Sequence, residues 1–175
     1  MKPLILVLLT AAVFGVRADD QSRERPLSAN AKAELLTTMR DAFADKRISK
    51  AQYDEAVSWV HSEPCDGVDR RLTERTKVKL QSALAKEQRL PSVRVSESFR
   101  SDGWVILYTD AGEGDESYLF YFADPATGSD PVAAWSGAAT IFETTEMIQW
   151  VKDNAKGIPR RLAECFSWHV TLNRY

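Results

Sequence analysis

Residues 92–136 read SVRVSESFRSDGWVILYTDAGEGDESYLFYFADPATGSDPVAAWS, and they predict an antiparallel sheet of four strands. The first part, 92–99, alternates apolar and polar residues, as a half-buried strand does. The segments 104–109 and 118–123 are apolar on both faces, which is typical of central strands that are covered on both sides. A short fourth strand is expected at 132–136.

Two turn-rich segments connect these strands. DAGEGDE at 110–116 and DPATGSD at 124–130 hold the Gly, Pro and Asp residues that favour tight turns. Because short connections join antiparallel neighbours, the four strands should form a meander in chain order. Since the central strands have no polar face, either helices cover both sides of the sheet or one side meets a partner or a ligand. We expect helices on both sides.

Helical patterns precede and follow the predicted strands in the sequence. Apolar residues recur at helical spacing over about 28–45, 49–64, 69–86, 142–154 and from 159 onward. The second pattern begins with the clearest signal, because Ser49 and Gln52 match a capping box. The predicted fold class is α+β: an N-terminal three-helix segment, a four-strand antiparallel meander and two C-terminal helices. Residues 28–175 form a single domain in this interpretation, and a subdomain boundary near 91 is the alternative.

The composition is that of a globular protein. Of 175 residues, 44% are hydrophobic and 27% are charged, which excludes a disordered chain, a collagen-like fibre and a protein with many membrane spans. The net charge of -2 at pH 7 argues against nucleic-acid binding, which needs a basic surface.

The first 18 residues, MKPLILVLLTAAVFGVRA, predict a cleaved signal peptide. Lys2 provides the positive start, and Ala18 gives a small residue at the cleavage point. The apolar run from Leu4 to Phe14 is too short to span a bilayer comfortably. After cleavage we expect a flexible leader over 19–27 and no insertion into the membrane. The protein should therefore be periplasmic or secreted.

Two cysteines and two histidines occur as neighbours, since His61 precedes Cys65 by four residues and Cys165 precedes His169 by four. We favour a Cys65–Cys165 disulfide, because an exported protein with an even number of cysteines folds under oxidising conditions. The alternative is a metal site formed by all four side chains, without the CxxC pair that would make it specific. We expect His169 to pack in the core, Trp168 to be partly exposed, and no cofactor.

The turn at 110–116 is the candidate partner-binding site. It crowds four acidic residues into one hairpin connection: Asp110, Glu113, Asp115 and Glu116. A solvated turn is the simplest interpretation, and calcium binding is an alternative, although the spacing does not match an EF-hand loop. A protruding acidic loop can also enter a basic cleft on another protein, where complementary charge speeds the encounter.

The sequence contains no GxSxG, HExxH or P-loop motif. Glu143 and Glu146 could act as an acid–base pair, but they lie where a helix is expected to begin, and acidic residues there favour the helix dipole. We therefore expect a binding protein rather than an enzyme.

The sharpest functional hypothesis is an exported protein of the bacterial envelope that binds another protein, as an inhibitor or immunity-type protein acting on a periplasmic toxin or hydrolase. The alternative is a module that binds a small ligand or the cell wall through exposed aromatic residues around Trp104 or Trp135. An enzyme of unknown chemistry comes third. The oligomeric state is left open.

Overall fold

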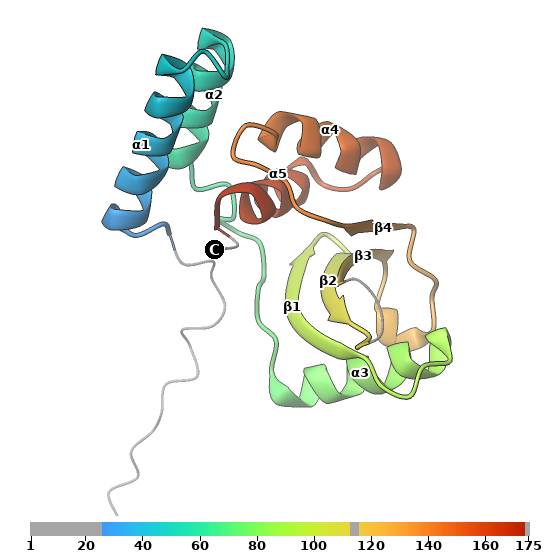
Figure 1. The fold of residues 1–175 in the computed structure, drawn as a ribbon. Helices are drawn as coiled ribbons and strands as arrows, with labels where there is room; N and C mark the ends of the chain where they lie inside the picture. The colour runs from blue at the N-terminus through green and yellow to red at the C-terminus, as the bar shows by residue number, and fades with distance from the viewer. Residues whose placement is uncertain (1–25, 113–115, 174–175) are drawn as a thin grey trace, which may run out of the picture.

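The structure is a computed structural model that describes residues 26–112 and 116–173. The predicted signal peptide at 1–18 and the leader residues 19–25 lie outside this range. The elements follow one another in the order predicted from the sequence (Figure 1). They are α1 (Ala29–Ala44), α2 (Lys50–His61), α3 (Glu74–Gln88), β1 (Arg94–Ser101), β2 (Trp104–Asp110), β3 (Ser117–Phe122), the 3₁₀ turn η1 (Pro125–Thr127), β4 (Ala133–Ser136), α4 (Thr144–Asn154), α5 (Arg160–Trp168) and the π-helical turn η2 (His169–Asn173).

The four strands form one antiparallel sheet in the order β1-β2-β3-β4, which confirms the predicted meander and the α+β class. In the register, Ile106 lies opposite Phe99 on one side and Phe120 on the other. The β1–β2 pairing shifts between Val95 and Glu97, as at a β-bulge. Such a shift re-aims the side chains that follow it.

Helices cover both faces of the sheet, as predicted (Figure 1). The side chains of Ile106 and Phe120 face α4 and α5 and belong to the larger hydrophobic cluster. Leu107 and Tyr121 point the other way and pack with Leu80 of α3 in a second cluster. This alternation explains why β2 and β3 are apolar on both faces: successive side chains point to opposite sides of the sheet, and helices cover each side.

The start of α3 differs from the prediction. The helix begins at Glu74, with Thr73 as its N-cap, rather than near Asp69. Asp69 and Arg100 instead exchange two backbone hydrogen bonds of 2.9 Å, so this part of the chain lies along the outer edge of β1. The predicted capping box of α2 is present, with Ser49 and Gln52 bonding each other's backbone N–H.

Phe166 of α5 is the centre of the larger cluster. Its ring contacts four sheet residues at centroid distances between 5.0 and 6.1 Å: Phe99, Tyr118, Phe120 and Trp135. The neighbouring Trp168 is buried, with 3% of its surface exposed, so the expectation that it is partly exposed was wrong. Its indole N–H donates to the backbone oxygen of Trp59 at 2.9 Å, which joins α5 to α2.

A disulfide joins Cys65 to Cys165, as predicted, with 4.5 Å between their Cα atoms. It connects the segment after α2 to the middle of α5, across a sequence separation of 100 residues. A cross-link over such a long loop restricts the unfolded chain strongly. The bond also fits an oxidising, extracellular compartment.

Replacing both cysteines with alanine (Cys65→Ala, Cys165→Ala) should lower the free energy of unfolding by about 4–5 kcal/mol, the value that the chain-entropy model gives for a loop of about 100 residues. Urea unfolding of the parent and the double variant measures the difference. The parent kept in reductant serves as the control and should lose a similar amount. A loss below about 1 kcal/mol would show that packing around α5, and not the cross-link, holds the two segments together.

Candidate functional site

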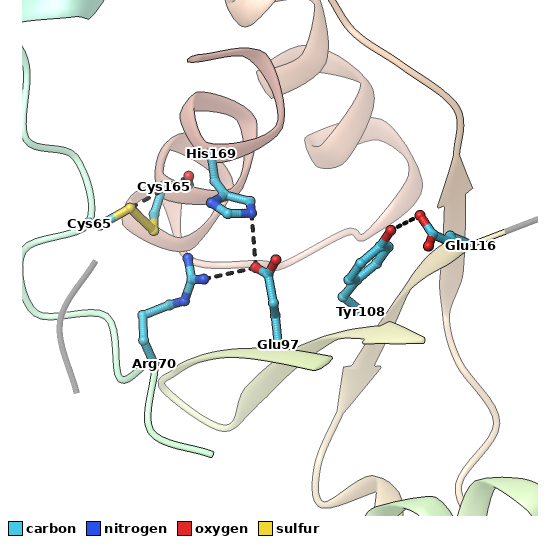
Figure 2. A network of polar contacts seen from close by, with 7 residues as sticks. All are labelled: Cys65, Arg70, Glu97, Tyr108, Glu116, Cys165 and His169. Carbon is cyan, nitrogen blue, oxygen red and sulfur yellow. Dashed lines mark hydrogen bonds and ion pairs between the residues drawn. A yellow bond between two sulfur atoms is a disulfide. The ribbon is translucent and has the colours of Figure 1, made fainter. Parts of the chain in front are cut away.

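The acidic loop lies at the end of the sheet where β2 passes to β3. Asp110 accepts a hydrogen bond from the Gly112 N–H at 2.8 Å, and its other oxygen lies 3.7 Å from the Arg94 guanidinium. Glu116 accepts a hydrogen bond from the hydroxyl of Tyr108 (Figure 2). Both carboxylates at the ends of the loop are therefore engaged within the chain, while the predicted binding residues Glu113 and Asp115 lie outside the described residues.

The two histidines of the alternative metal site have different surroundings. His61 is exposed at the end of α2, whereas His169 is buried with 5% of its surface accessible, as expected for a packed histidine. Both Cys65 and Cys165 use their sulfur atoms in the disulfide. Within the described ranges, no group of three or more His, Cys, Asp or Glu side chains is placed to hold a metal ion.

A polar network that the sequence did not reveal lies beside the disulfide (Figure 2). Its centre is Glu97, one of whose oxygens lies 2.9 Å from the Arg70 guanidinium and 2.9 Å from Nε2 of His169. The shift in β1 puts Glu97 opposite Tyr108, on the face that meets α5. The network thus connects the segment after the disulfide, the edge strand and the last helix.

Burial governs the chemistry of this network. The guanidinium of Arg70 lies 3.5 Å from the centre of the Phe99 ring, in a cation–π contact. Burial lowers the pKa of Arg70 to about 10, against the opposing attraction of Glu97. Arg70 remains charged at neutral pH, so it needs the Glu97 carboxylate close to it. The network therefore holds three segments of the chain together. In the sequence, its signal was a charged residue at a position of β1 that faces the core.

The other end of the sheet, at the β1–β2 turn, carries a largely apolar hollow of about 560 Å³. We name it the Phe122 hollow. Its lining comes from β2, β3, the loop before β4, the end of α4 and the segment after α4: Trp104, Phe122, Val132, Asp153, Asn154, Lys156 and Gly157. The Phe122 side chain is 62% exposed and Val132 is 50% exposed, which is unusual for large apolar residues. Phe122 is the last residue of β3, and the C-terminal residues of α4 lie on the other side of the hollow.

A second hollow of about 530 Å³ lies on the α3 side of the same turn, and we name it the Arg100 hollow. Its polar lining comes from α3, the end of β1, the β1–β2 turn and the residue before η1: Thr76, Lys79, Arg100, Ser101, Asp102 and Asp124. The tight turn between β1 and β2 uses Asp102 and Gly103, both at positive φ, as a two-residue hairpin turn requires. Trp104 borders both hollows.

The aromatic residues of the ligand-binding alternative are placed differently from the expectation. Trp104 is buried, with 6% of its surface exposed, and its ring lies 5.5 Å from that of Phe122. Trp135 is half-buried at the edge strand, where it packs against Tyr118 and Phe166. The exposed aromatic side chain of this region is Phe122. The sequence did not indicate this exposure, because Phe122 ends an apolar strand in which core residues are expected.

Glu143 and Glu146 lie at the start of α4, as predicted. One oxygen of Glu143 accepts hydrogen bonds from the backbone N–H and the hydroxyl of Thr140, both at 2.7 Å. These two bonds lower the pKa of Glu143. The carboxylate thus helps to close the turn that leads into the helix.

No protein family, curated protein or solved structure matches this chain. None of the described helices is both long enough and apolar enough to cross a membrane.

Replacing Glu97 with glutamine (Glu97→Gln) should reduce the free energy of unfolding by about 1–3 kcal/mol. The change leaves the charge of Arg70 buried without its carboxylate. The expected loss is smaller than the roughly 3–5 kcal/mol for fully buried pairs, because Glu97 is partly exposed. Urea unfolding measures the effect. The control is Asp54→Asn, which breaks an exposed ion pair with Lys50 and should cost about 0.5 kcal/mol or less. Equal effects of the two variants would contradict the role given to the network.

Stability should also depend on Glu143 in a pH-sensitive way. Because the pKa of Glu143 is lower in the folded chain than in the unfolded one, its contribution is complete above the unfolded pKa and disappears as the pH falls through the folded pKa. Glu143→Gln should therefore cost about 0.5–1 kcal/mol at neutral pH, a small value because the group is exposed. Chemical unfolding at pH 7 and pH 3 tests this, since the cost should be smaller at the lower pH.

Proposed function

We propose that this protein is exported to the bacterial envelope and acts by binding another protein, as an inhibitor or immunity-type protein against a periplasmic toxin or hydrolase. The disulfide supports export, because it suits an oxidising compartment. The binding role is supported mainly by one observation, which is the Phe122 hollow with its exposed apolar side chains.

The Phe122 hollow has the features of an anchor site in a protein interface. Binding energy in such interfaces concentrates in a few apolar or aromatic side chains that fill pockets, and a polar rim excludes water around them. Here Phe122 and Val132 provide the apolar surface, and Asp153, Asn154 and Lys156 form a polar rim. An apolar side chain of the partner would pack against the exposed surfaces of Phe122 and Val132.

The acidic loop contributes in a different way in this proposal. It lies at the opposite end of β2 from the Phe122 hollow, since β2 runs from Trp104 to Asp110. Its charge would steer a basic partner during the approach, which affects the rate of association. The apolar anchor, by contrast, should control the rate of dissociation. The two surfaces can therefore be separated by kinetics.

A second candidate function is the binding of a small ligand or a cell-wall fragment in the same hollow. The volume of about 560 Å³ is within the usual range for ligand pockets. Trp104 borders the hollow, so a bound ligand should change its fluorescence. The same variants can therefore test both candidates.

The first test of binding is kinetic. We expect the mature chain to capture a protein at equal stoichiometry from envelope extracts of its own organism. Phe122→Ser should then raise the dissociation rate by about tenfold or more, since a lost anchor costs about 1.4 kcal/mol or more. The matched control is Val78→Ser, because Val78 is 59% exposed on α3, away from the hollow lining. It should change the rate less than about twofold.

Three outcomes of this test decide between the candidates. If the complexes of Phe122→Ser and Val78→Ser with the partner dissociate at the same rate, the Phe122 hollow does not anchor the partner. If serine replacements of Asp110 and Glu116 leave the association rate unchanged, the loop has no steering role. If no protein is captured but a cell-wall fragment quenches Trp104 fluorescence in the parent and not in Phe122→Ser, the ligand-binding candidate replaces the first.

Export is tested separately from binding. The chain expressed with its own first 18 residues should appear in the periplasmic fraction with Asp19 at its N-terminus. Its intact mass should be that of the mature chain with two hydrogen atoms fewer, because of the disulfide. A cytoplasmic product that retains Met1 would overturn the proposed location.

A further inference from the structure

Arg100 has donors that no described residue uses. Its backbone N–H and C=O are both bonded to Asp69 at 2.9 Å, so the residue has a fixed place at the edge of the sheet. Its side chain is half-buried in the Arg100 hollow and makes no hydrogen bond or ion pair with any described residue. A guanidinium carries five N–H donors, and leaving them unpaired in a partly buried place is costly. This arrangement points to a ligand that accepts hydrogen bonds.

The carboxylates around Arg100 are already engaged. Asp124 lies 3.2 Å from the ammonium group of Lys79 and also accepts the N–H of Ala126 at 3.0 Å. These bonds, together with the charge of Arg100, lower the pKa of Asp124. Asp102 is exposed at the turn and accepts the hydroxyl of Ser101 at 3.0 Å. Arg100 is thus the cation of this hollow without a bonded counter-charge among the described residues.

The charge balance indicates which anion fits. The hollow contains two cations, Lys79 and Arg100, and two carboxylates, Asp102 and Asp124. A doubly charged phosphate would meet repulsion from both carboxylates. A single carboxylate carries half of that charge and matches the planar fork of the guanidinium with two parallel hydrogen bonds.

The backbone around the hollow is held in an unusual conformation. Ala123 has a φ of +99°, a value that residues with a side chain rarely adopt, and its N–H donates to the Gly103 oxygen at 2.9 Å. This bond joins the end of β3 to the β1–β2 turn. Because Ala123, Gly103 and Trp104 all line the Arg100 hollow, its wall is a fixed surface rather than a loose loop.

We propose that the Arg100 hollow is a carboxylate-binding subsite, and that its occupant is an Asp or Glu side chain of the partner protein. The second part rests on the proposed function. Trp104 borders both hollows, so one segment of the partner can reach both. The partner segment therefore carries an acidic residue near the apolar residue that enters the Phe122 hollow.

The subsite can be tested without the partner, by NMR of the ¹⁵N-labelled mature protein. The probes are sodium acetate, inorganic phosphate, and the blocked dipeptides N-acetyl-Phe-Glu-amide and N-acetyl-Phe-Gln-amide, all at equal ionic strength. We expect acetate and the Glu dipeptide to shift the side-chain Nε–H signal of Arg100 in a saturable way. The Gln dipeptide should bind at least about fivefold more weakly, and phosphate should not exceed acetate.

Variants decide whether the signal comes from the proposed contact. Arg100→Gln should abolish the difference between the two dipeptides, and Arg100→Lys, which keeps the charge but loses the fork, should retain only part of it. Arg40→Gln on the exposed surface of α1 is the matched control and should change nothing. Backbone spectra of each variant verify that the fold is kept. Equal binding of both dipeptides to the parent would overturn the subsite.

The identity of the occupant is tested on the captured complex. Arg100→Gln should capture less of the partner than the parent does. Excess acetate should likewise reduce the amount of partner that the parent captures. If capture depends on Phe122 but not on Arg100, the assignment to the partner's side chain is wrong while the proposed function stands. If the Glu dipeptide binds but no partner is captured, the subsite serves a free carboxylate, and the proposed function fails instead.

Discussion

The packing of α5 on the sheet is the contact on which the rest of the structure depends. Phe166 enters a space lined by aromatic residues of three strands, and the disulfide fixes the helix one residue before it. Without this layer, the inward face of β2 and β3 would lie in water, because α3 covers only the other face. The same helix supplies Trp168, which bonds to α2 and so attaches the α1–α2 pair to the core.

This arrangement gives the two ends of the sheet different properties. At the β2–β3 end, Asp110 and Glu116 lie at the two ends of the acidic loop. The network around Glu97 lies on the face of the sheet that α5 covers. At the β1–β2 end, Phe122 stays exposed and two hollows open on either side of the turn. The acidic loop thus lies at one end of the sheet and the two hollows at the other. In protein binding, charge mainly affects the rate of association, and most differences in affinity arise from the rate of dissociation.

The network of Arg70, Glu97 and His169 departs from the rule that inward positions are apolar. A buried ion pair contributes little net stability when compared with apolar packing, but breaking it is costly. Its effect here is to specify how three segments meet, since Arg70 follows the disulfide, Glu97 lies on β1 and His169 follows α5. The Arg100 side chain, on the opposite face of the same strand, has no such partner among the described residues, and this contrast within one strand supports the proposed carboxylate-binding subsite.

Local patterns were enough to predict the elements, their order and the disulfide. Alternation and turn residues identify the strands, the capping box at Ser49 identifies α2, and two cysteines allow one pairing within the chain. The start of α3 was misplaced, because Asp69 finds backbone partners on β1 that no local pattern reveals. The candidate sites could not be predicted either. Phe122 reads as a core residue, although the packing of the helices leaves 62% of it exposed. Arg100 reads as a surface charge until its neighbours prove to be paired with others. Sequence periodicity reports which side a residue faces, whereas exposure and pairing depend on distant segments that only packing brings together.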